Sequence, residues 1–476
     1  MAETRIERDS MGEMQVPSDA AYGASTQRAV LNFPVSGYRF GRRFLRALGL
    51  IKFAAAEANA SLGRLDRKLA AQIQKAAREL MDGKLDQHFP LDVFQTGSGT
   101  STNMNANEVL ANRACELAGH ERGSKFIHPN DHVNMGQSSN DVIPTAIHVA
   151  AVEALHRDLQ PALHKLHNAL AAKAKAWDDI VKIGRTHLMD ATPIRLGQVF
   201  SGYASQISHS DRRIGQKVVI LRELPIGGTA VGTGINTHPE FARRVCEIIN
   251  HETHESFHEA QNHFEAQHSK DAMVGAASML KVVAISVGKI ANDIRWLGSG
   301  PRCGIGELIL PATQPGSSIM PGKVNPVICE SVMQVCSFVV GADAAISHAA
   351  STLGNFELHV GMPVIAHQFL EATRLLSNVC NVFVDKCIDG LEADRARCTE
   401  LIEQSLMMCT SLAPIVGYDA AAAIAKEAHQ TGKTVRQIAS EQLKSGKIKL
   451  TEAQLNEALD PRAMTMPSDK MLPVSA

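Results

Sequence analysis

The sequence predicts a mainly α-helical protein built from more than one domain. Five segments show helical hydrophobic periodicity over lengths well above the ordinary helix of about 11–12 residues. One begins near residue 139, and the others cover about 194–224, 268–298, 326–352 and 363–391. Because their apolar positions spread over more than one side, we expect these helices to pack against one another as a bundle. At 476 residues, the chain also exceeds what one hydrophobic core usually covers.

The parts of the chain around these segments have other patterns. Residues 1–40 are rich in turn formers, so we expect irregular structure there, followed by a helix with one apolar face that includes Leu45, Leu48, Ile51 and Ala55. In the helix that begins near residue 139, leucines continue at helical spacing and Pro161 predicts a kink. Past Cys398, short helical patterns with turns at Gly417, Gly432 and Gly446 predict a small helical domain at the C-terminal end.

Composition and charge narrow the class of protein. Hydrophobic residues make up 45% of the chain and the formal net charge is −1, so no basic excess points to nucleic acid or to an anionic membrane. The apolar runs near 273–287 and 332–350 contain Lys281, Gln334 and Asp343, so we do not expect them to span a membrane. Acidic residues near the start argue against a secretory signal, and nine cysteines without a Cys-x-x-Cys pair favour reduced thiols. We therefore expect a cytoplasmic protein.

The stretch from Gly316 to Pro326 reads Gly-Ser-Ser-Ile-Met-Pro-Gly-Lys-Val-Asn-Pro and carries most of the chemical information. Pro321 and Gly322 predict a loop, and the Asn-Pro pair at its end predicts an N-cap and first helical turn. Loop amides, the Lys323 ammonium and a helix N-terminus would favour an anion. Taken alone, however, such a loop is more often a surface turn before an ordinary helix.

Three more polar loops have a similar design. They lie at Gln95–Glu108, His128–Pro144 and Gly184–Pro193, and each is expected to open a helix, with Pro144 and Pro193 in first turns. The free N–H groups and positive dipole ends of such helices could together hold a small dianion with two carboxylates. A polar helix cap explains each loop equally well when it is considered alone, and the sequence does not show that the loops meet.

These motifs, together with Asp9-Ser-Met-Gly, Tyr22-Gly-Ala-Ser-Thr-Gln-Arg and the glycine-rich segment Gly227–Gly234, resemble the class II fumarases of the fumarase/aspartase superfamily. The resemblance extends over nearly the whole chain. It implies a three-domain fold with a mostly helical domain at 1–138, a central bundle of five long helices at 139–394 and a small helical domain at 395–476. It also implies a homotetramer with a twenty-helix core, active sites assembled from three subunits, and no cofactor or metal.

The resemblance assigns roles to particular residues. Ser317 would be the base, and His187 the acid, oriented and charged by Glu330. A small dicarboxylate would be bound by Ser98, Thr100, Ser138, Ser139, Asn140, Thr186, Lys323 and Asn325. A second anion-binding segment would comprise Lys125, His128, Asn130 and Asp131.

The reaction implied is the reversible anti elimination of water from (S)-malate to give fumarate, a step of the tricarboxylic acid cycle. Removing a proton beside a carboxylate creates an aci-carboxylate intermediate, which positive groups stabilise. A serine is a poor base unless its alkoxide is stabilised, so we expect Ser317 to act when its loop closes and excludes water.

Two sequence differences separate this reaction from that of aspartate ammonia-lyases. Ser138-Ser139 and Pro321-Gly322-Lys323 stand where those enzymes usually have Ser-Thr and Pro-Ala-Lys, whereas His132 is typical of them. Other departures from fumarases are Met189, His359 and Gly361, which leave a related dicarboxylate open as the substrate.

The sequence disfavours two functions of other classes. An inactive family member with a structural role would have lost the serine, lysine or histidine, and all three are present. The segment His254–His258 satisfies the zinc-protease pattern His-Glu-x-x-His, but it is polar all round, so catalytic zinc is disfavoured.

Overall fold

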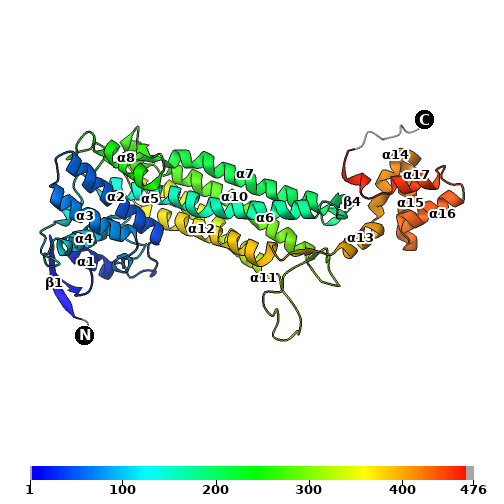
Figure 1. The fold of residues 1–476 in the computed structure, drawn as a ribbon, viewed down its shortest axis with the longest axis horizontal. Coiled ribbons are helices and arrows are strands. Elements are labelled where there is room, and N and C mark those ends of the chain that lie inside the picture. The colour runs from blue at the N-terminus through cyan, green and yellow to red at the C-terminus, as the bar shows by residue number, and fades with distance from the viewer. Residues whose placement is uncertain (1–2, 468–476) are drawn as a thin grey trace. The chain divides into compact units, whose positions relative to one another are not determined.

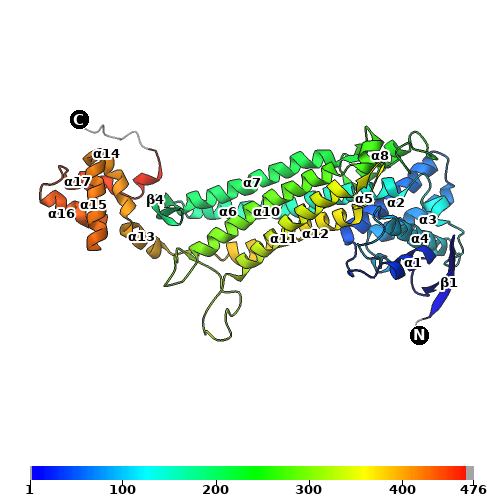
Figure 2. The same cartoon turned by 180° about the vertical axis from the view of Figure 1, so that it is seen from behind.

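The computed structural model describes residues 3–467 and is mainly helical, with short two-stranded sheets, which confirms the predicted fold class (Figures 1 and 2). The chain divides into two compact units. The first unit contains residues 1–162, 210–285 and 334–378, and the second contains residues 163–209, 286–333 and 379–476. The three-domain division expected from the sequence stays a prediction.

Helices dominate the first unit, in which α2 packs against α3, α5 and α8. The apolar face predicted for α2 is confirmed, because Leu45, Leu48, Ile51 and Ala55 are all buried. The elements are α1 (Ala24–Asn32), α2 (Arg42–Ser61), α3 (Arg67–Met81), η1 (Asp86–His88), α4 (Thr100–Leu117), η2 (Pro129–Val133), α5 (Ser139–Ala154), α8 (Phe241–Thr253) and α9 (His263–His268), with the strands β5 (Glu223–Leu224), β6 (His258–Glu259), β8 (Gly354–Asn355) and β9 (Leu358–His359).

A β-hairpin lies where the sequence predicted irregular structure. Strand β1 (Thr4–Asp9) pairs antiparallel with β2 (Gly12–Pro17), and α1 follows them. The hairpin was missed because β1 contains a single apolar residue, Ile6, which is largely exposed, and because the alternation in β2 is limited to Met14 and Val16.

The long helical segments match the sequence prediction within a few residues. They are α5 with η3 (Leu155–Leu159) and α6 (Gln160–Ala176), then α7 (Leu196–Leu221), α10 (Asp271–Leu297), α11 (Val327–Thr352), and α12 (Met362–Phe383) with η4 (Val384–Ile388). Instead of a simple kink, a π-helical turn precedes Pro161. A π-helical turn accommodates a proline that lacks an N–H and whose ring would clash with a carbonyl one turn earlier. Pro144 lies in the second turn of α5, since that helix already begins at Ser139.

The two apolar runs considered in the sequence belong to α10 and α11. By length and composition alone, both helices would be able to cross a membrane, a test that core helices of water-soluble proteins also pass. In the first unit they are joined by an ion pair, with Lys281 Nζ 2.5 Å from Asp343 Oδ2. Such a charged pair is costly in hydrocarbon, so the pattern is weak evidence for a membrane protein.

The second unit includes a small helical region at its C-terminal end, as predicted. Its core is formed by buried residues such as Ile424, Ile438 and Leu455. Its turns at Gly417, Gly432 and Gly446 have φ values of 90°, 69° and 75°, a region that favours glycine. The elements are β3 (Val181–Thr186), β4 (Met189–Arg195), β7 (Leu308–Ile309), β10 (Glu392–Ala393), α13 (Arg395–Gln404), η5 (Leu406–Ser411), α14 (Ala413–Val416), α15 (Tyr418–Thr431), α16 (Val435–Lys444), α17 (Glu452–Ala458) and η6 (Ala463–Thr465).

Candidate active site

Three hydroxyl groups form a hydrogen-bonded chain in the first unit, at the N-termini of α4 and α5. Ser98 Oγ lies 2.7 Å from Thr100 Oγ1, which lies 2.7 Å from Ser139 Oγ. Ser98 and Ser139 are buried, with 6% and 8% of their surface exposed. The first two polar loops predicted from the sequence therefore do meet.

Two glycines allow this approach. Gly99 precedes α4 with φ 71°, a left-handed conformation that costs little without a side chain. At Gly97, an added Cβ would lie 2.0 Å from the carbonyl oxygen of Val360, so only glycine fits there. The Gly97 carbonyl also accepts a hydrogen bond from Met362 N at 3.1 Å, which fixes the loop against the start of α12.

The N-terminus of α5 is capped by a network centred on Asp141. Ser138 Oγ accepts from Asn140 N at 3.2 Å, and Asp141 Oδ1 accepts from Ser138 N at 2.9 Å. Asp141 Oδ2 accepts from Gly227 N and Thr229 N, each at 3.0 Å. Burial raises the pKa of the Asp141 carboxyl to about 6, against the opposing effect of these hydrogen bonds and of Lys52.

The same network fixes a candidate substrate-binding side chain. Asn140 Nδ2 donates to Ala230 O at 2.8 Å, so the glycine-rich segment after Gly227 is held to the loop. Two helix N-termini thus adjoin at one cluster of hydroxyl and amide groups. Such an arrangement favours a negatively charged ligand.

Thr186 and His187 lie on the β3–β4 hairpin of the second unit. The hairpin turns at His187 and Leu188, whose φ values are 57° and 62°. Two consecutive left-handed residues form a tight turn that favours Asn-Gly, so a histidine and a leucine there store strain. All residues of this turn are exposed, as is Met189 beside it.

The helix cap predicted at Thr192–Pro193 is wrong. Both residues lie in β4, with Pro193 opposite Ile183, and α7 begins only at Leu196. The two-stranded sheet explains this outcome, since a proline without an N–H is tolerated in an edge strand.

A buried ion cluster supports the hairpin, and sequence reasoning missed it. Arg185 Nη1 lies 3.0 Å from both carboxylate oxygens of Glu307, and Lys182 Nζ lies 3.0 Å from Oε2 of the same group. Glu307 is fully buried. Burial lowers the pKa of Lys182, and the Glu307 charge opposes that effect. The residue types were visible in the sequence, but no local pattern shows that they pair.

The Gly316–Pro326 segment is a loop of the second unit whose two ends are hydrogen-bonded to each other. Gly316 N donates to Lys323 O at 2.8 Å, which joins the two ends of the loop. Ser317 Oγ accepts from Ile319 N at 3.2 Å and from Met320 N at 3.0 Å. Ser317 is partly buried, whereas the Lys323 side chain is exposed.

The predicted N-cap at Asn325 is wrong by one residue. Helix α11 begins at Val327, and Pro326 O accepts from Glu330 N at 3.1 Å. Asn325 instead donates through Nδ2 to Gly316 O at 2.6 Å, so its side chain closes the loop. Glu330 lies in the first turn of α11, as predicted.

The predicted catalytic and substrate-binding residues thus fall into three groups. The first unit brings together Ser98, Thr100, Ser138, Ser139 and Asn140. The second unit holds Thr186 and His187 on a hairpin, and Ser317, Lys323, Asn325 and Glu330 on the loop and helix that follow. Within the described part of that unit, no hydrogen bond or ion pair joins His187 to Ser317 or Glu330.

The segment predicted to bind a second anion borders a cavity of about 290 Å³ in the first unit. Lys125, His128 and Asn130 line the cavity, whereas Asp131 does not. His128 Nδ1 accepts from Asn130 N and Asp131 N at 3.3 and 3.2 Å. It also lies 3.2 Å from Asp131 Oδ2. Nδ1 must carry a proton to donate to the Asp131 carboxylate, whereas it must offer a lone pair to accept from the N–H groups of Asn130 and Asp131. The contact with the carboxylate and the contacts with the N–H groups therefore exclude each other.

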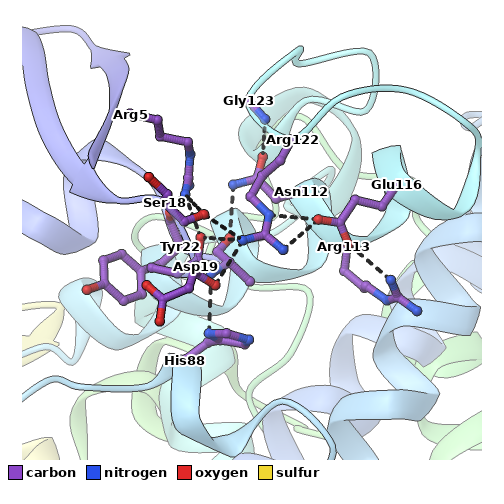
Figure 3. A network of polar contacts seen from close by, with 12 residues as sticks. Arg5, Ser18, Asp19, Tyr22, His88, Asn112, Arg113, Glu116, Arg122 and Gly123 are labelled. Carbon is purple, nitrogen blue, oxygen red and sulfur yellow. Dashed lines mark hydrogen bonds and ion pairs between the residues drawn. The ribbon is translucent and has the colours of Figure 1, made fainter. Parts of the chain in front are cut away.

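Figure 3 shows how the segment that leads to this cavity wall is held. Arg122 Nη1 donates to the carbonyls of Ser18, Asp19 and Ala20, and Arg5 Nη2 donates to Tyr22 O. Arg113 on α4 and Arg122 in the loop that follows it both pair with Glu116 of α4. Arg122 therefore fastens the backbone before Tyr22 to Glu116 of α4, and Arg5 fastens Tyr22 to β1.

The histidine-rich segment does not form the helix that a zinc protease needs. Helix α8 ends at Thr253, and His254 follows it with φ 59°. His258 begins strand β6. The two histidines of the pattern therefore do not share one helical face.

Residues 12–341 match the family described as "Lyase", and residues 408–466 match that described as "Fumarase C C-terminus". The fumarate hydratase class II of Halobacterium salinarum is 54% identical over 97% of each chain, and that of Corynebacterium glutamicum is 51% identical over 97% of this chain and 96% of its own. The recombinant class II fumarase from Schistosoma mansoni has a crystal structure that superposes with a TM-score of 0.94 at 38% identity, over 98% of this chain and all of that one. The chain belongs to the class II fumarate hydratase family.

Proposed function

We propose that this protein catalyses the reversible hydration of fumarate to (S)-malate by anti addition and elimination, as a cytoplasmic enzyme of the tricarboxylic acid cycle. The observation that carries the proposal is the chain of hydroxyls through Ser98, Thr100 and Ser139 at two adjoining helix N-termini. Hydroxyl donors and positive dipole ends suit a carboxylate. Similarity to fumarate hydratases over nearly the whole chain supports the choice of dicarboxylate.

Ser317 is the proposed base. In the elimination direction it takes a proton from the carbon beside a carboxylate, and that carboxylate becomes the aci-carboxylate, stabilised by Lys323 and Asn325. The backbone supports this role, because two N–H groups already donate to Ser317 Oγ. Such donors favour the charged alkoxide over the neutral hydroxyl.

His187 is the proposed acid, which delivers a proton through a water molecule to the departing hydroxide. Glu330 is proposed to orient the imidazole and to favour its protonated form. Since no contact within the described chain joins these two residues, the proposal places them together only in the assembled protein. Thr186, beside His187, would contact the substrate.

The assembly proposed is a homotetramer with a twenty-helix core and active sites shared by three subunits. Exposed apolar side chains on α10 and α11 support such an interface, and they include Val282, Ile285, Phe338 and Val340. Large exposed apolar surfaces in soluble proteins commonly mark contacts with a partner. The domains proposed for each subunit are residues 1–138, 139–394 with five long helices, and 395–476.

Ultraviolet absorbance of the fumarate double bond tests the proposal. Purified protein is mixed, without added metal, with (S)-malate and separately with L-aspartate. We expect a rising signal from malate alone. A signal from aspartate alone would replace the proposal with an ammonia-lyase. Silence with both would direct the search to substituted dicarboxylates, because Met189 beside the His187 turn has 70% of its surface exposed.

A further inference from the structure

A lysine ammonium is buried against the segment that leads into the N-terminus of α5 in the first unit. Lys52 lies on α2 and has no exposed surface. Its Nζ donates to Asn134 Oδ1 and Gln137 Oε1, each at 2.9 Å. Both partners are neutral amides, so the ammonium is solvated by the protein without a directly bonded carboxylate.

The two partners of Lys52 belong to the segment that ends in the candidate site. Gln137 immediately precedes Ser138, the N-cap of α5. Asn134 Oδ1 also accepts from Asn103 Nδ2 at 3.2 Å, and Asn103 lies on α4 one turn after Thr100. One ammonium therefore links both of the helix N-termini that carry the hydroxyl chain.

The electrostatic surroundings leave this charge only partly balanced. Asp141 on α5 is the charged group that acts on Lys52, and that carboxylate already accepts three backbone N–H bonds. Four other elements pack against α2, namely α3, α4, α8 and η2. No described titratable group on them shifts the pKa of Lys52 through its charge. Burial lowers the pKa of Lys52 to about 7, and the Asp141 charge opposes this shift.

We propose that Lys52 is a positioning residue for the dicarboxylate site: its ammonium fixes the Asn134–Ser138 segment and supplies a positive charge beneath the bound dianion. The inference rests on the proposed function for the class of ligand. A bound dianion stabilises the charged lysine, so binding and protonation of Lys52 favour each other. At metal sites, residues that orient the ligands change affinity or activity by roughly ten- to a hundredfold, and we expect an effect of similar size here.

The test measures binding of succinate, a saturated dicarboxylate that has no double bond to hydrate, by titration calorimetry on the assembled protein. Lys52→Met removes the charge at similar length. Lys270→Met is the matched control, because Lys270 is also a buried lysine of the first unit, and its Nζ donates to Gln267 O and Ser269 O at 2.8 Å. We expect Lys52→Met to raise the succinate Kd about tenfold or more, and Lys270→Met to leave it unchanged.

The pH dependence separates charge from packing. In the wild type, Lys52 loses its proton above pH about 7 when no ligand is bound, so the succinate Kd should rise with pH there, by up to about tenfold per unit. Lys52→Met should lack this slope, and the KM for malate should rise more than kcat falls. If Lys52→Met does not fold, Lys52→Gln and the wild-type slope give the answer.

Equal succinate affinity and an equal slope in Lys52→Met and Lys270→Met would overturn the proposal, as would a wild type that binds no dicarboxylate. A wild type that binds succinate but does not hydrate fumarate would refute the proposed function alone. In that case Lys52 is still judged by the difference between the two variants.

Discussion

At the scale of single residues, Ser317 is the most direct test of the chemistry. Its Oγ is held by two backbone N–H groups and its side chain packs against no core, so Ser317→Ala should leave folding and assembly intact. Loss of the base should lower kcat for malate by about a hundredfold to ten-thousandfold. Ser318→Ala is the matched control, since Ser318 is the exposed neighbour, and it should retain activity. Substantial turnover by Ser317→Ala would remove this serine as the base.

A second prediction at this scale concerns His148 and pH. His148 is buried on α5 with Nδ1 2.9 Å from Glu223 O, and burial lowers its pKa to about 4 from the ordinary 6.5. Between these values the unfolded chain binds more protons than the folded one, so stability rises with pH. Acidification from pH about 6.5 to about 4 should therefore cost up to about 3 kcal/mol through this group.

Urea unfolding near pH 5 and near pH 7 measures this effect. His148→Gln keeps a hydrogen-bond donor without the titration, so it should lose less stability than the wild type between these pH values. His251→Gln, at a histidine whose side chain is 87% exposed, is the control for loss of a histidine. If His148→Gln loses as much stability between pH 7 and pH 5 as the wild type does, His148 is not the group responsible for the pH dependence.

At the scale of elements, the strained turn between β3 and β4 makes a prediction about stability. Leu188 has φ 62° and is 69% exposed, so it bears backbone strain without a packing role. Leu188→Gly removes the strain, whereas Leu188→Ala removes the side chain and keeps the strain. We expect the glycine variant to be more stable than the alanine variant by about 1 kcal/mol. Urea unfolding of the glycine and alanine variants measures this difference in stability. A more stable alanine variant would show that the backbone at Leu188 is not strained.

The elements also show what the sequence can predict. The helices α7, α10, α11 and α12 were placed within a few residues because each repeats its apolar positions over many turns. The first hairpin was missed because β1 has one apolar residue and the alternation in β2 is short. The second was missed because Thr192–Pro193 has the composition of a helix cap. Short elements depend on partners distant in sequence, and local patterns do not record those partners.

At the scale of the whole molecule, the sequence identified the loops but could not show how they are supported. Ser98, Thr100 and Ser139 were predicted by resemblance, and the structure brings them together. Lys52 and Glu307 were not predicted, since a single charge near an apolar run gives no sign of what it contacts. That His187 meets Ser317 stays a prediction, because no hydrogen bond or ion pair joins the two within the described residues.

Assembly gives the last prediction, based on two inactive variants. His187→Asn lacks the proposed acid and Ser317→Ala lacks the proposed base, so the assembly formed by either variant alone should be inactive. Suppose that an active site takes His187 from one subunit and Ser317 from another. In a random equal mixture, a site has a chance of one half of receiving an intact His187 and a chance of one half of receiving an intact Ser317. About one quarter of the sites are then complete. Denaturing the two variants together and refolding them should therefore restore up to about a quarter of wild-type activity, while separately refolded samples mixed afterwards should stay inactive. Mixed tetramers verified by two affinity tags that nevertheless show no activity would mean that both residues must come from the same chain.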